Sequence, residues 1–297
     1  MSSYLIFRTD RIGDFLLTII LINSIKRNDP NSFITVIASR KNYHFIKSFK
    51  IINEVLILEN TLLGKIKLIY KLRSVYYENI IIHDSKNRSS IISLFLKYRL
   101  KIKPNNNLNI SYIDSIKEII SKLNFNFIES DLNTLNNRDY NFSENSNTDF
   151  ILFHFDEKWI HNDYISKYTN IEPSKDDLIL FINLLLTTSD KKLVITTGSK
   201  CPKILNDLIE NNFSSRVKIF KELNFLDLEN MVSKCNLLIS CHGSISHIAA
   251  AHNIKQIDLI EKKRLDFYLK WTKHFRNYFP IYRIKFSELS NKIIDII

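Results

Sequence analysis

The feature that most constrains the fold is a regular alternation of short apolar runs with longer stretches whose apolar residues recur at helical spacing. In the first third of the chain, the short runs occupy residues 2–9, 32–39, 53–58 and 78–85. A stretch of helical pattern follows each run, at residues 14–30, 40–49, 64–77 and 88–100. Strands that alternate with helices at this interval form parallel βαβ units, which predicts an α/β domain.

The same alternation returns in the second half of the chain. Its predicted strands are residues 149–155, 191–199, 216–220, 236–244 and 254–260. Its predicted helices are residues 175–188, 202–213, 226–235, 245–253 and 286–297. An Asn-rich connector at residues 103–148 separates the two series and carries one amphipathic stretch at 112–125.

The two series predict two Rossmann-like α/β domains whose parallel sheets face a central cleft. We assign the N-terminal domain to residues 1–145 and the C-terminal domain to residues 146–285. Residues 286–297 are expected to form a closing helix that packs back toward the N-terminal domain. Ligands of such sheets bind beyond the carboxyl ends of the strands, so functional side chains are expected in the turns there.

Composition narrows the class of protein and of partner. Three cysteines form neither an even disulfide set nor a CxxC pair, which favours a reducing compartment. There is no basic-then-apolar leader and no apolar run of about 18 residues, so a cytoplasmic protein is expected. The net charge of +11 favours an acidic partner, or reflects a lysine-rich composition alone. No basic and aromatic stripe supports nucleic acid, so peripheral contact with the anionic inner face of the inner membrane is the favoured interpretation.

Three of the four glycines, Gly13, Gly198 and Gly243, follow predicted strands directly. Glycine permits positive φ and lets a ligand approach the backbone closely, although ordinary strand-end turns also use it. Gly243 opens a predicted helix of small residues that begins at Ser244, Ile245 and Ser246. The unsatisfied N–H groups at such a start suit a phosphate or diphosphate. Neither a GxxxxGK[ST] nor a GxGxxG motif is present.

Three further side chains are expected near the same turn. Lys158 follows the strand at 149–155 and is placed to meet a phosphate held there; the alternative is a solvated lysine. His242 and His247 flank the turn, but their i, i+5 spacing and the lack of a completing Cys or carboxylate argue against a metal. Each histidine is expected either to donate to a phosphate or sugar hydroxyl, or to be a satisfied, buried side chain.

The first turn carries two carboxylates, Asp10 and Asp14, around Gly13. Asp14 lies at the start of the first predicted helix, where we expect the helix dipole to keep it ionised. Asp10 is expected to have a structural or capping role near Arg8 or Arg11. Arg11 is in turn a candidate contact for anionic groups of a substrate.

The turn after the fourth predicted strand, "HDSKNRSS", is basic and rich in hydroxyl groups. Its Ser85, Lys86 and Arg88 are candidate contacts for an anionic or polyhydroxylated acceptor. Because this strand and the first strand belong to the same predicted sheet, both turns are expected at its carboxyl edge.

Taken together, these segments resemble glycosyltransferase family nine, the ADP-heptose:lipopolysaccharide heptosyltransferases and their relatives. The segment "RTDRIGDFLLTIILINSIKRNDPNSFITVIAS" is similar to the family's opening, and "FHFDEKW" is similar to its lysine-bearing loop. "IIIHDSKNRSSIISLFLKYRLKIK" resembles its strand, basic turn and helix, and "LDLENMVSKCNLLISCHGSISHIAAAHNIKQIDLI" its nucleotide site. The resemblance spans most of the chain in the family's order.

The resemblance implies a GT-B fold, with the acceptor on the N-terminal domain and a nucleotide-diphosphate sugar, ADP-linked by preference, on the C-terminal domain. It implies inverting transfer without a metal or other cofactor. By position, Asp14 matches the family's catalytic carboxylate and Lys158 its phosphate-binding lysine. The turn from His242 to His247 matches the segment written D-[ST]-G-x-x-H, with His242 in place of Asp and Ser244 in place of Gly.

The function expected from the resemblance is transfer of a heptose or another sugar onto a lipopolysaccharide core or other surface glycan. Exchange of the usual Asp for His242 leaves the donor sugar open. The alternative is a catalytically silent relative of the same fold that binds nucleotide and acts as an assembly partner in glycan biosynthesis.

Overall fold

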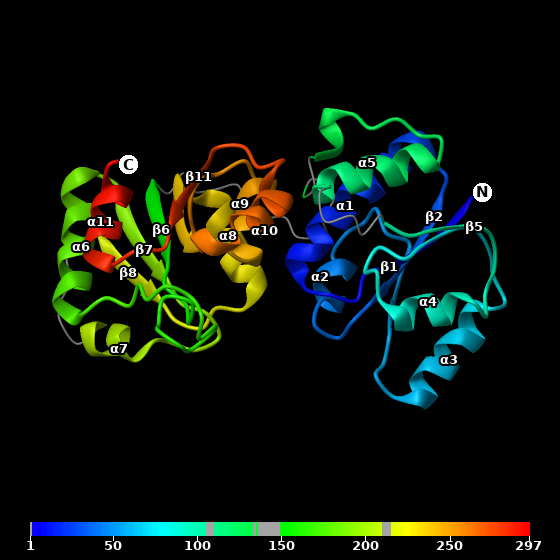
Figure 1. Ribbon diagram of the computed structural model, residues 1–297, viewed down its shortest axis with the longest axis horizontal. Coiled ribbons are helices and arrows are strands. Elements are labelled where there is room, and N and C mark those ends of the chain that lie inside the picture. The colour runs from blue at the N-terminus through cyan, green and yellow to red at the C-terminus, as the bar shows by residue number, and fades with distance from the viewer. Residues whose placement is uncertain (1, 105–109, 133–134, 136–148, 210–214) are drawn as a thin grey trace. The chain divides into compact units, whose positions relative to one another are not determined.

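The chain divides into two compact units, Met1–Asn141 and Phe142–Ile297 (Figure 1). The computed structural model describes residues 2–104, 110–132, 135, 149–209 and 215–297. The boundary expected between residues 145 and 146 lies outside these described residues. No helix in the described parts of the chain is both long enough and apolar enough to cross a membrane.

The first unit is built on a parallel sheet of five strands in the order β3-β2-β1-β4-β5. The strands are β1 (Ser3–Phe7), β2 (Phe33–Ala38), β3 (Glu54–Ile57), β4 (Tyr76–Ile81) and β5 (Lys97–Ile102). The helices are α1 (Ile12–Asn28), α2 (Tyr43–Lys47), α3 (Leu62–Leu72), α4 (Asn87–Ser93) and α5 (Tyr112–Lys122), with the 3-10 turn η1 at Glu129–Leu132. The strand order reverses between β1 and β4, so the turns after these two strands lie at the switch point where such sheets bind ligands.

Helices cover both faces of this sheet. Leu68 and Leu72 of α3 and Ile92 of α4 pack in one buried cluster with Leu5 and Phe7, the side chains on one face of β1. On the other side of the sheet, α1 packs against α5. The buried, nearly continuous apolar pattern of β1 and β2 is what a sheet covered on both faces requires.

The expectation of one helix over residues 88–100 is corrected by the structure. Helix α4 ends at Ser93, and Lys97–Ile102 forms the edge strand β5, paired in parallel with β4. Lys97, Arg99 and Lys101 alternate along this strand, a period of two that suits an exposed sheet edge. The preceding apolar residues obscured that period in the sequence.

The second unit is built on a parallel sheet of six strands in the order β11-β10-β9-β6-β7-β8. The strands are β6 (Phe150–His154), β7 (Lys192–Thr196), β8 (Val217–Phe220), β9 (Leu237–Cys241), β10 (Lys255–Ile260) and β11 (Tyr278–Tyr282). The helices are α6 (Lys175–Thr188), α7 (Lys203–Ile209), α8 (Phe225–Lys234), α9 (Ser244–Ala251), α10 (Leu265–Thr272) and α11 (Phe286–Ile294), with the 3-10 turn η2 at Lys262–Arg264. Here the order reverses between β6 and β9, which places the loop after β6 beside the turn into α9.

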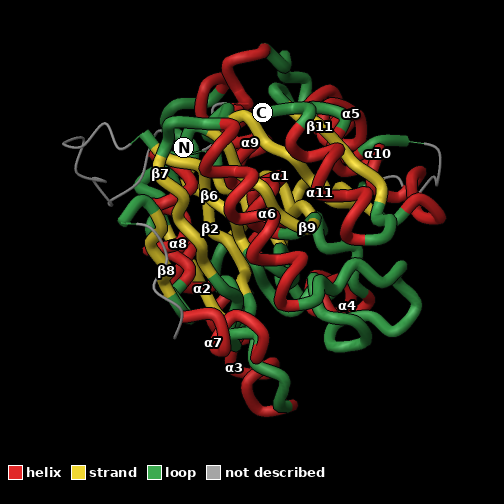
Figure 2. The backbone as a smooth tube through the Cα atoms, turned by 90° about the vertical axis from the view of Figure 1, so that its left-hand side faces the viewer, coloured by secondary structure: helices red, strands yellow, loops and turns green. Residues whose placement is uncertain are grey.

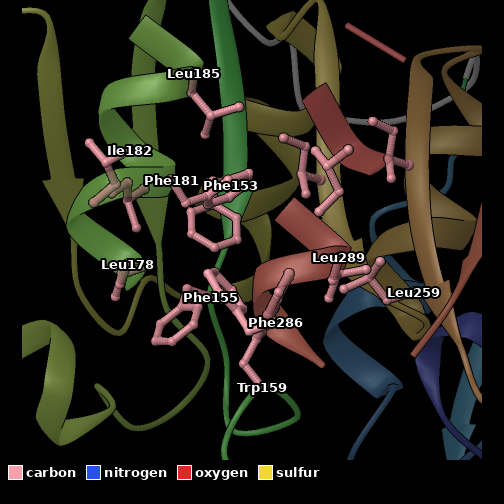
Figure 3. Close-up of a cluster of buried hydrophobic side chains, with 14 of the residues drawn as sticks. Phe153, Phe155, Trp159, Leu178, Phe181, Ile182, Leu185, Leu259, Phe286 and Leu289 are labelled. Atoms are coloured by element: carbon pink, nitrogen blue, oxygen red, sulfur yellow. The ribbon is translucent and has the colours of Figure 1, made fainter. Parts of the chain in front are cut away.

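The core of the second unit is aromatic. Phe153 contacts the rings of Phe155, Trp159 and Phe181, and Phe286 of α11 packs on Trp159 and Phe181 (Figure 3). Helices α6 and α11 lie side by side over one face of the sheet (Figure 2). The apolar face of α11 therefore belongs to the core of the second unit.

Two elements of the second unit have no counterpart among the predicted ones. Helix α10 and strand β11 occupy the stretch between the last predicted strand and the closing helix. Pro280 lies within β11, and the strand tolerates it because β11 is at the edge of the sheet.

Candidate functional site

The turn from β1 into α1 is organised by a buried arginine. The Arg8 side chain donates from Nε to Oγ1 of Thr18 (2.7 Å) and from Nη1 to Oδ2 of Asp10 (3.1 Å). Asp10 also forms an ion pair with Lys86, from the turn after β4. Asp10 thus joins two turns at the sheet edge, which is a structural role.

Asp14 lies in the first turn of α1 and caps it. Its Oδ2 accepts a hydrogen bond from the backbone N–H of Arg11 (3.0 Å), so the capping function considered for Asp10 belongs to Asp14. Burial raises the pKa of the Asp14 carboxyl above its ordinary value, against the opposing effect of the Arg8 guanidinium. Burial therefore makes Asp14 a stronger base than an exposed aspartate.

The turn after β4 is brought to the same edge of the sheet. Asp84 is buried there and accepts hydrogen bonds from Oγ1 of Thr9 (2.6 Å) and Oγ of Ser89 (2.7 Å). Arg88 donates from Nη2 to Oγ1 of Thr9 (2.8 Å), and Lys86 donates to the Thr9 carbonyl oxygen (3.3 Å). The candidate cations Lys86 and Arg88 are therefore held close to the turn that carries Asp14.

Ser85 lies at the outer end of this turn. Its φ of 53° is in the left-handed region, which is uncommon for serine, and its side chain is exposed. Strained residues of this kind persist where surrounding contacts fix them and often lie at ligand sites.

Two titratable groups near Asp14 were not singled out from the sequence. Tyr112 begins α5, and burial together with the Asp14 carboxylate raises the pKa of its phenol. His83 is buried against Thr18 (2.9 Å), and burial with the Arg8 guanidinium holds its pKa well below the usual range. No local motif marks either residue, because only the packing of α5 and β4 around α1 brings them to the turn.

In the second unit, the loop after β6 holds Lys158 by a buried ion pair. Its Nζ lies 2.7 Å from Oδ2 of Asp156. Burial alone would lower the pKa of Lys158, but the Asp156 carboxylate outweighs it and raises that pKa above its ordinary value. Burial would raise the pKa of Asp156, yet the Lys158 ammonium holds it below its usual range. Both groups are charged at neutral pH, so Lys158 is a fixed cation rather than a solvated surface lysine.

Gly243 lies directly against that cation. A Cβ placed on Gly243 would be 2.7 Å from Nζ of Lys158, closer than an ordinary van der Waals contact. The φ of Gly243 is 179°, an extended value that any residue adopts, and none of the four glycines has positive φ. Of the two properties of glycine considered from the sequence, close approach is therefore the one that Gly243 provides, here to Lys158.

The start of α9 is only partly open. The N–H of Gly243 donates to Oγ of Ser246 (3.2 Å), and that hydroxyl donates to Oδ1 of Asp258 (2.8 Å). The Gly243 amide and the Ser246 hydroxyl are thus occupied, contrary to expectation. Within the part of the chain that the structure describes, the N–H groups of Ser244 and Ile245 have no hydrogen-bond partner. The N–H groups of Ser244 and Ile245 are therefore available to bind an anion.

His242 is oriented by a buried carboxylate. Its Nδ1 lies 2.6 Å from Oδ2 of Asp258, which is fully buried in β10 and also accepts from the Tyr278 hydroxyl (3.0 Å). The ring lies edge-on to Tyr268. The Asp258 carboxylate is therefore present at this turn. It comes from the neighbouring strand β10, whereas the sequence resemblance places an Asp at position 242 itself.

His247 takes the second of its two expected roles. It is buried, with its ring against Trp271 and Phe275. Burial, with the nearby His242 and His274, holds the pKa of His247 well below its usual range, so the side chain is neutral. His247 thus packs as a core residue beneath the turn.

A buried arginine that the sequence did not single out supports the lysine loop. Arg283 follows β11 and donates to the carbonyl oxygens of Lys158 (2.8 Å) and Thr169 (3.1 Å) and to Sγ of Cys241 (3.3 Å). A pocket opens beside it, lined by Lys158, Tyr168 and Arg283 among others. Only the pairing of β10 with β11 brings Arg283 here, which explains why local sequence did not reveal it.

The described residues contain no group of three His, Cys, Asp or Glu side chains placed to hold a metal ion. The polar groups at each of the two turns, taken separately, are instead cations, amides, hydroxyls and single carboxylates. Each turn by itself suits an anionic or hydroxylated ligand.

Comparisons with known proteins find likeness in structure alone. No protein-family model matches the chain, and no curated protein matches its sequence. The Escherichia coli heptosyltransferase WaaC, solved with ADP, superposes with a TM-score of 0.74 at 11% identity, over 99% of this chain and 98% of that one. A family 9 glycosyltransferase of Veillonella parvula gives 0.72 at 13% identity, over 99% and 91%. E. coli ADP-heptose lipopolysaccharide heptosyltransferase II gives 0.69 at 14% identity, over 99% and 97%.

At such identities the likeness establishes the fold. The chain is an α/β protein of GT-B architecture with two Rossmann-like units, as its sequence predicts.

Proposed function

We propose that this chain is a metal-independent, inverting glycosyltransferase that uses a nucleotide-diphosphate sugar. The observation that carries the proposal is the Lys158 ammonium, held by Asp156 against Gly243 at the start of α9. A fixed cation beside two unpartnered amides is the arrangement that stabilises a diphosphate without a metal. The shared fold with glycosyltransferases supports this class.

On the donor side, the bond between the anomeric carbon and the diphosphate oxygen breaks, and the diphosphate leaves with the electron pair. Lys158 and the N–H groups of Ser244 and Ile245 meet the charge that develops on the leaving oxygen. His242 is a further contact, because Asp258 fixes its Nδ1 and leaves its Nε2 for the donor. We propose an ADP-linked donor, a heptose or another sugar.

On the acceptor side, the acceptor oxygen forms the new bond to the anomeric carbon from the opposite face, which inverts the configuration. Asp14 takes the proton of that hydroxyl. Its raised pKa makes it a more effective base than an exposed aspartate, and general base catalysis contributes about 10²–10⁴-fold to a rate. Arg11, Gly13 and the 85–88 turn, with Lys86 and Arg88, would bind the acceptor.

The acceptor that we propose is an anionic glycolipid or glycan, such as a lipopolysaccharide core or another surface glycan. The cationic turn of the first unit supports an anionic acceptor, and the net charge of +11 supports action at the anionic inner face of the inner membrane.

The test combines binding with turnover. Calorimetry with ADP, UDP, GDP and CMP should detect affinity for a nucleoside diphosphate, with ADP preferred. The Asp14→Asn variant should retain that affinity and lose transfer by at least about 100-fold. Wild-type turnover in this variant would remove Asp14 as the base. Nucleotide binding with no transfer to any acceptor, in the wild type as in the variant, would instead favour the silent relative.

A further inference from the structure

The first unit exposes apolar side chains that its own core does not use. Along α3 and directly after α4, six large apolar residues are between 52% and 73% exposed. They are Leu62, Leu63, Ile66, Tyr70, Leu94 and Phe95. These six residues are called the α3–α4 surface below. Scattered exposed apolar residues are ordinary, but a set of this size on neighbouring elements marks an interaction site.

Helix α3 has two distinct apolar faces. Leu68 and Leu72 face inward and are buried against the sheet. Leu62, Ile66 and Tyr70 recur every four residues and form a second stripe that is turned to solvent. The inner face is enough to hold the helix on the sheet, so the outer stripe requires another explanation.

Both parts of the α3–α4 surface belong to one face of the first sheet. The buried residues beneath them, Leu68 and Leu72 of α3 with Ile92 and Leu96 at α4, belong to a single core cluster. The two helices are drawn in cyan in Figure 1. The exposed residues are therefore carried by the same layer of the unit.

Lysines and arginines lie among and beside these residues in the chain. Residues 62–101 contain nine Lys or Arg and two acidic residues, although Lys86 and Arg88 among them belong to the turn after β4. Lys71 pairs with Glu54 and Arg99 pairs with Glu78. Within the described part of the first unit, Lys65, Lys67 and Lys97 have no carboxylate at ion-pair distance. Their charge is available to an external anion.

We propose that the α3–α4 surface docks on an anionic lipid bilayer. The apolar side chains enter the boundary between headgroups and acyl chains, while the flanking lysines and arginines contact lipid phosphates. A second copy of the chain fits less well, because a symmetric contact through this surface would bring the unpaired Lys65, Lys67 and Lys97 of two copies together. This inference rests on the proposed function for its biological setting, but lipid binding is measured without any transfer assay.

The experiment is sedimentation of the full chain with vesicles of phosphatidylcholine, with and without phosphatidylglycerol. Wild type should bind the phosphatidylglycerol vesicles, and binding should weaken as salt rises. The triple variant Leu62→Ser, Leu63→Ser, Tyr70→Ser should bind at least about tenfold more weakly. The single variants Lys65→Glu and Lys67→Glu should each bind the vesicles about fivefold more weakly or worse, because one basic side chain near an anionic membrane contributes about that factor to the affinity.

Matched controls come from the second unit. Leu180→Ser with Leu269→Ser removes two apolar side chains of similar exposure, 59% and 53%, and Lys200→Glu with Lys203→Glu reverses two exposed lysines. Both controls should bind like wild type. All variants should keep the wild-type circular dichroism and nucleotide affinity, which separates loss of docking from failure to fold and from failure of the proposed function.

Three results would overturn the proposal. The first is undiminished vesicle binding by the triple variant, and the second is equal loss in the controls. The third is concentration-dependent dimerisation of wild type, abolished by the triple variant, with no vesicle binding; this would assign the surface to a second copy.

Discussion

Replacing Gly243 by alanine isolates the contact on which the donor site depends. The new Cβ would lie 2.7 Å from Nζ of Lys158, so the ammonium must retreat by about 0.7 Å to reach an ordinary contact of 3.4 Å. The atom that has to move is the end of a flexible side chain. The extended backbone at residue 243 accepts alanine without strain.

Gly243→Ala should change the free energy of unfolding only slightly but lower the affinity for nucleotide strongly. Loss of chain entropy in the unfolded state favours alanine by about 0.4–1 kcal/mol, and weakening of the Lys158–Asp156 pair offsets part of it, so the free energy of unfolding should change by less than about 1 kcal/mol. A hydrogen bond to a charged group contributes about 1.5–3 kcal/mol, so displacing Lys158 from a diphosphate should lower its affinity by about 10- to 100-fold.

Calorimetry with the preferred nucleoside diphosphate, together with chemical unfolding, measures both quantities. A double-mutant cycle with Lys158→Met gives the sharper test, because the two changes act through the same ammonium. In the Lys158→Met background, Gly243→Ala should cost less than about threefold in affinity, since no ammonium remains to be displaced. Additive losses in the double variant would refute the reasoning, as would wild-type affinity in Gly243→Ala.

The remaining predictions concern the support of the donor site and its independence of metals. Arg283→Met removes three buried hydrogen bonds and should lower the free energy of unfolding by about 2–4 kcal/mol in urea, with weaker nucleotide binding; an unchanged midpoint would contradict its supporting role. The folded-state pKa of Asp156 is lowered, so its ionisation stabilises the fold above its unfolded pKa of about 4, and this stability is lost as pH falls through the lowered value. Acid unfolding of Asp156→Asn should therefore lack this part of the pH dependence, and an unchanged pH profile would argue against the ion pair. Transfer activity should survive EDTA treatment, and its loss with recovery on adding a divalent cation would contradict a donor site built on Lys158.

The sequence was sufficient for those parts of the fold and site that depend on local pattern. Apolar runs followed by helical periodicity predicted the βα order of both units, and α6 was predicted over the residues where it occurs. The turns carrying Asp14 and Gly243 were found because a glycine interrupts each pattern at a strand end. The sequence placed Lys158 and Gly243 after the carboxyl ends of two strands, and the structure adds that these strands are neighbours and that the two residues are in contact.

What the sequence did not reveal depends on contacts between distant residues. Asp258 lies in β10 and Arg283 directly follows β11. No sequence spacing relates them to His242 or Lys158, because only the assembled sheet brings these residues together. The pKa of Asp14 depends on how deeply its carboxyl is buried, which a helix-dipole argument does not include. Edge strand β5 was missed because the apolar residues before it continued the helical pattern of α4, and β11 was missed because a proline interrupts its apolar run.

The reactivity of the three thiols can be used to measure opening of the second unit. Burial raises the pKa of Cys241, at the end of β9 against Arg283, and of Cys235 to about 12, so neither reacts while folded. Cys201 is half-buried and should react first with an alkylating reagent. Slow alkylation of Cys241 then measures the rate at which β9 separates from its neighbours, and a bound nucleotide should reduce that rate in proportion to its occupancy.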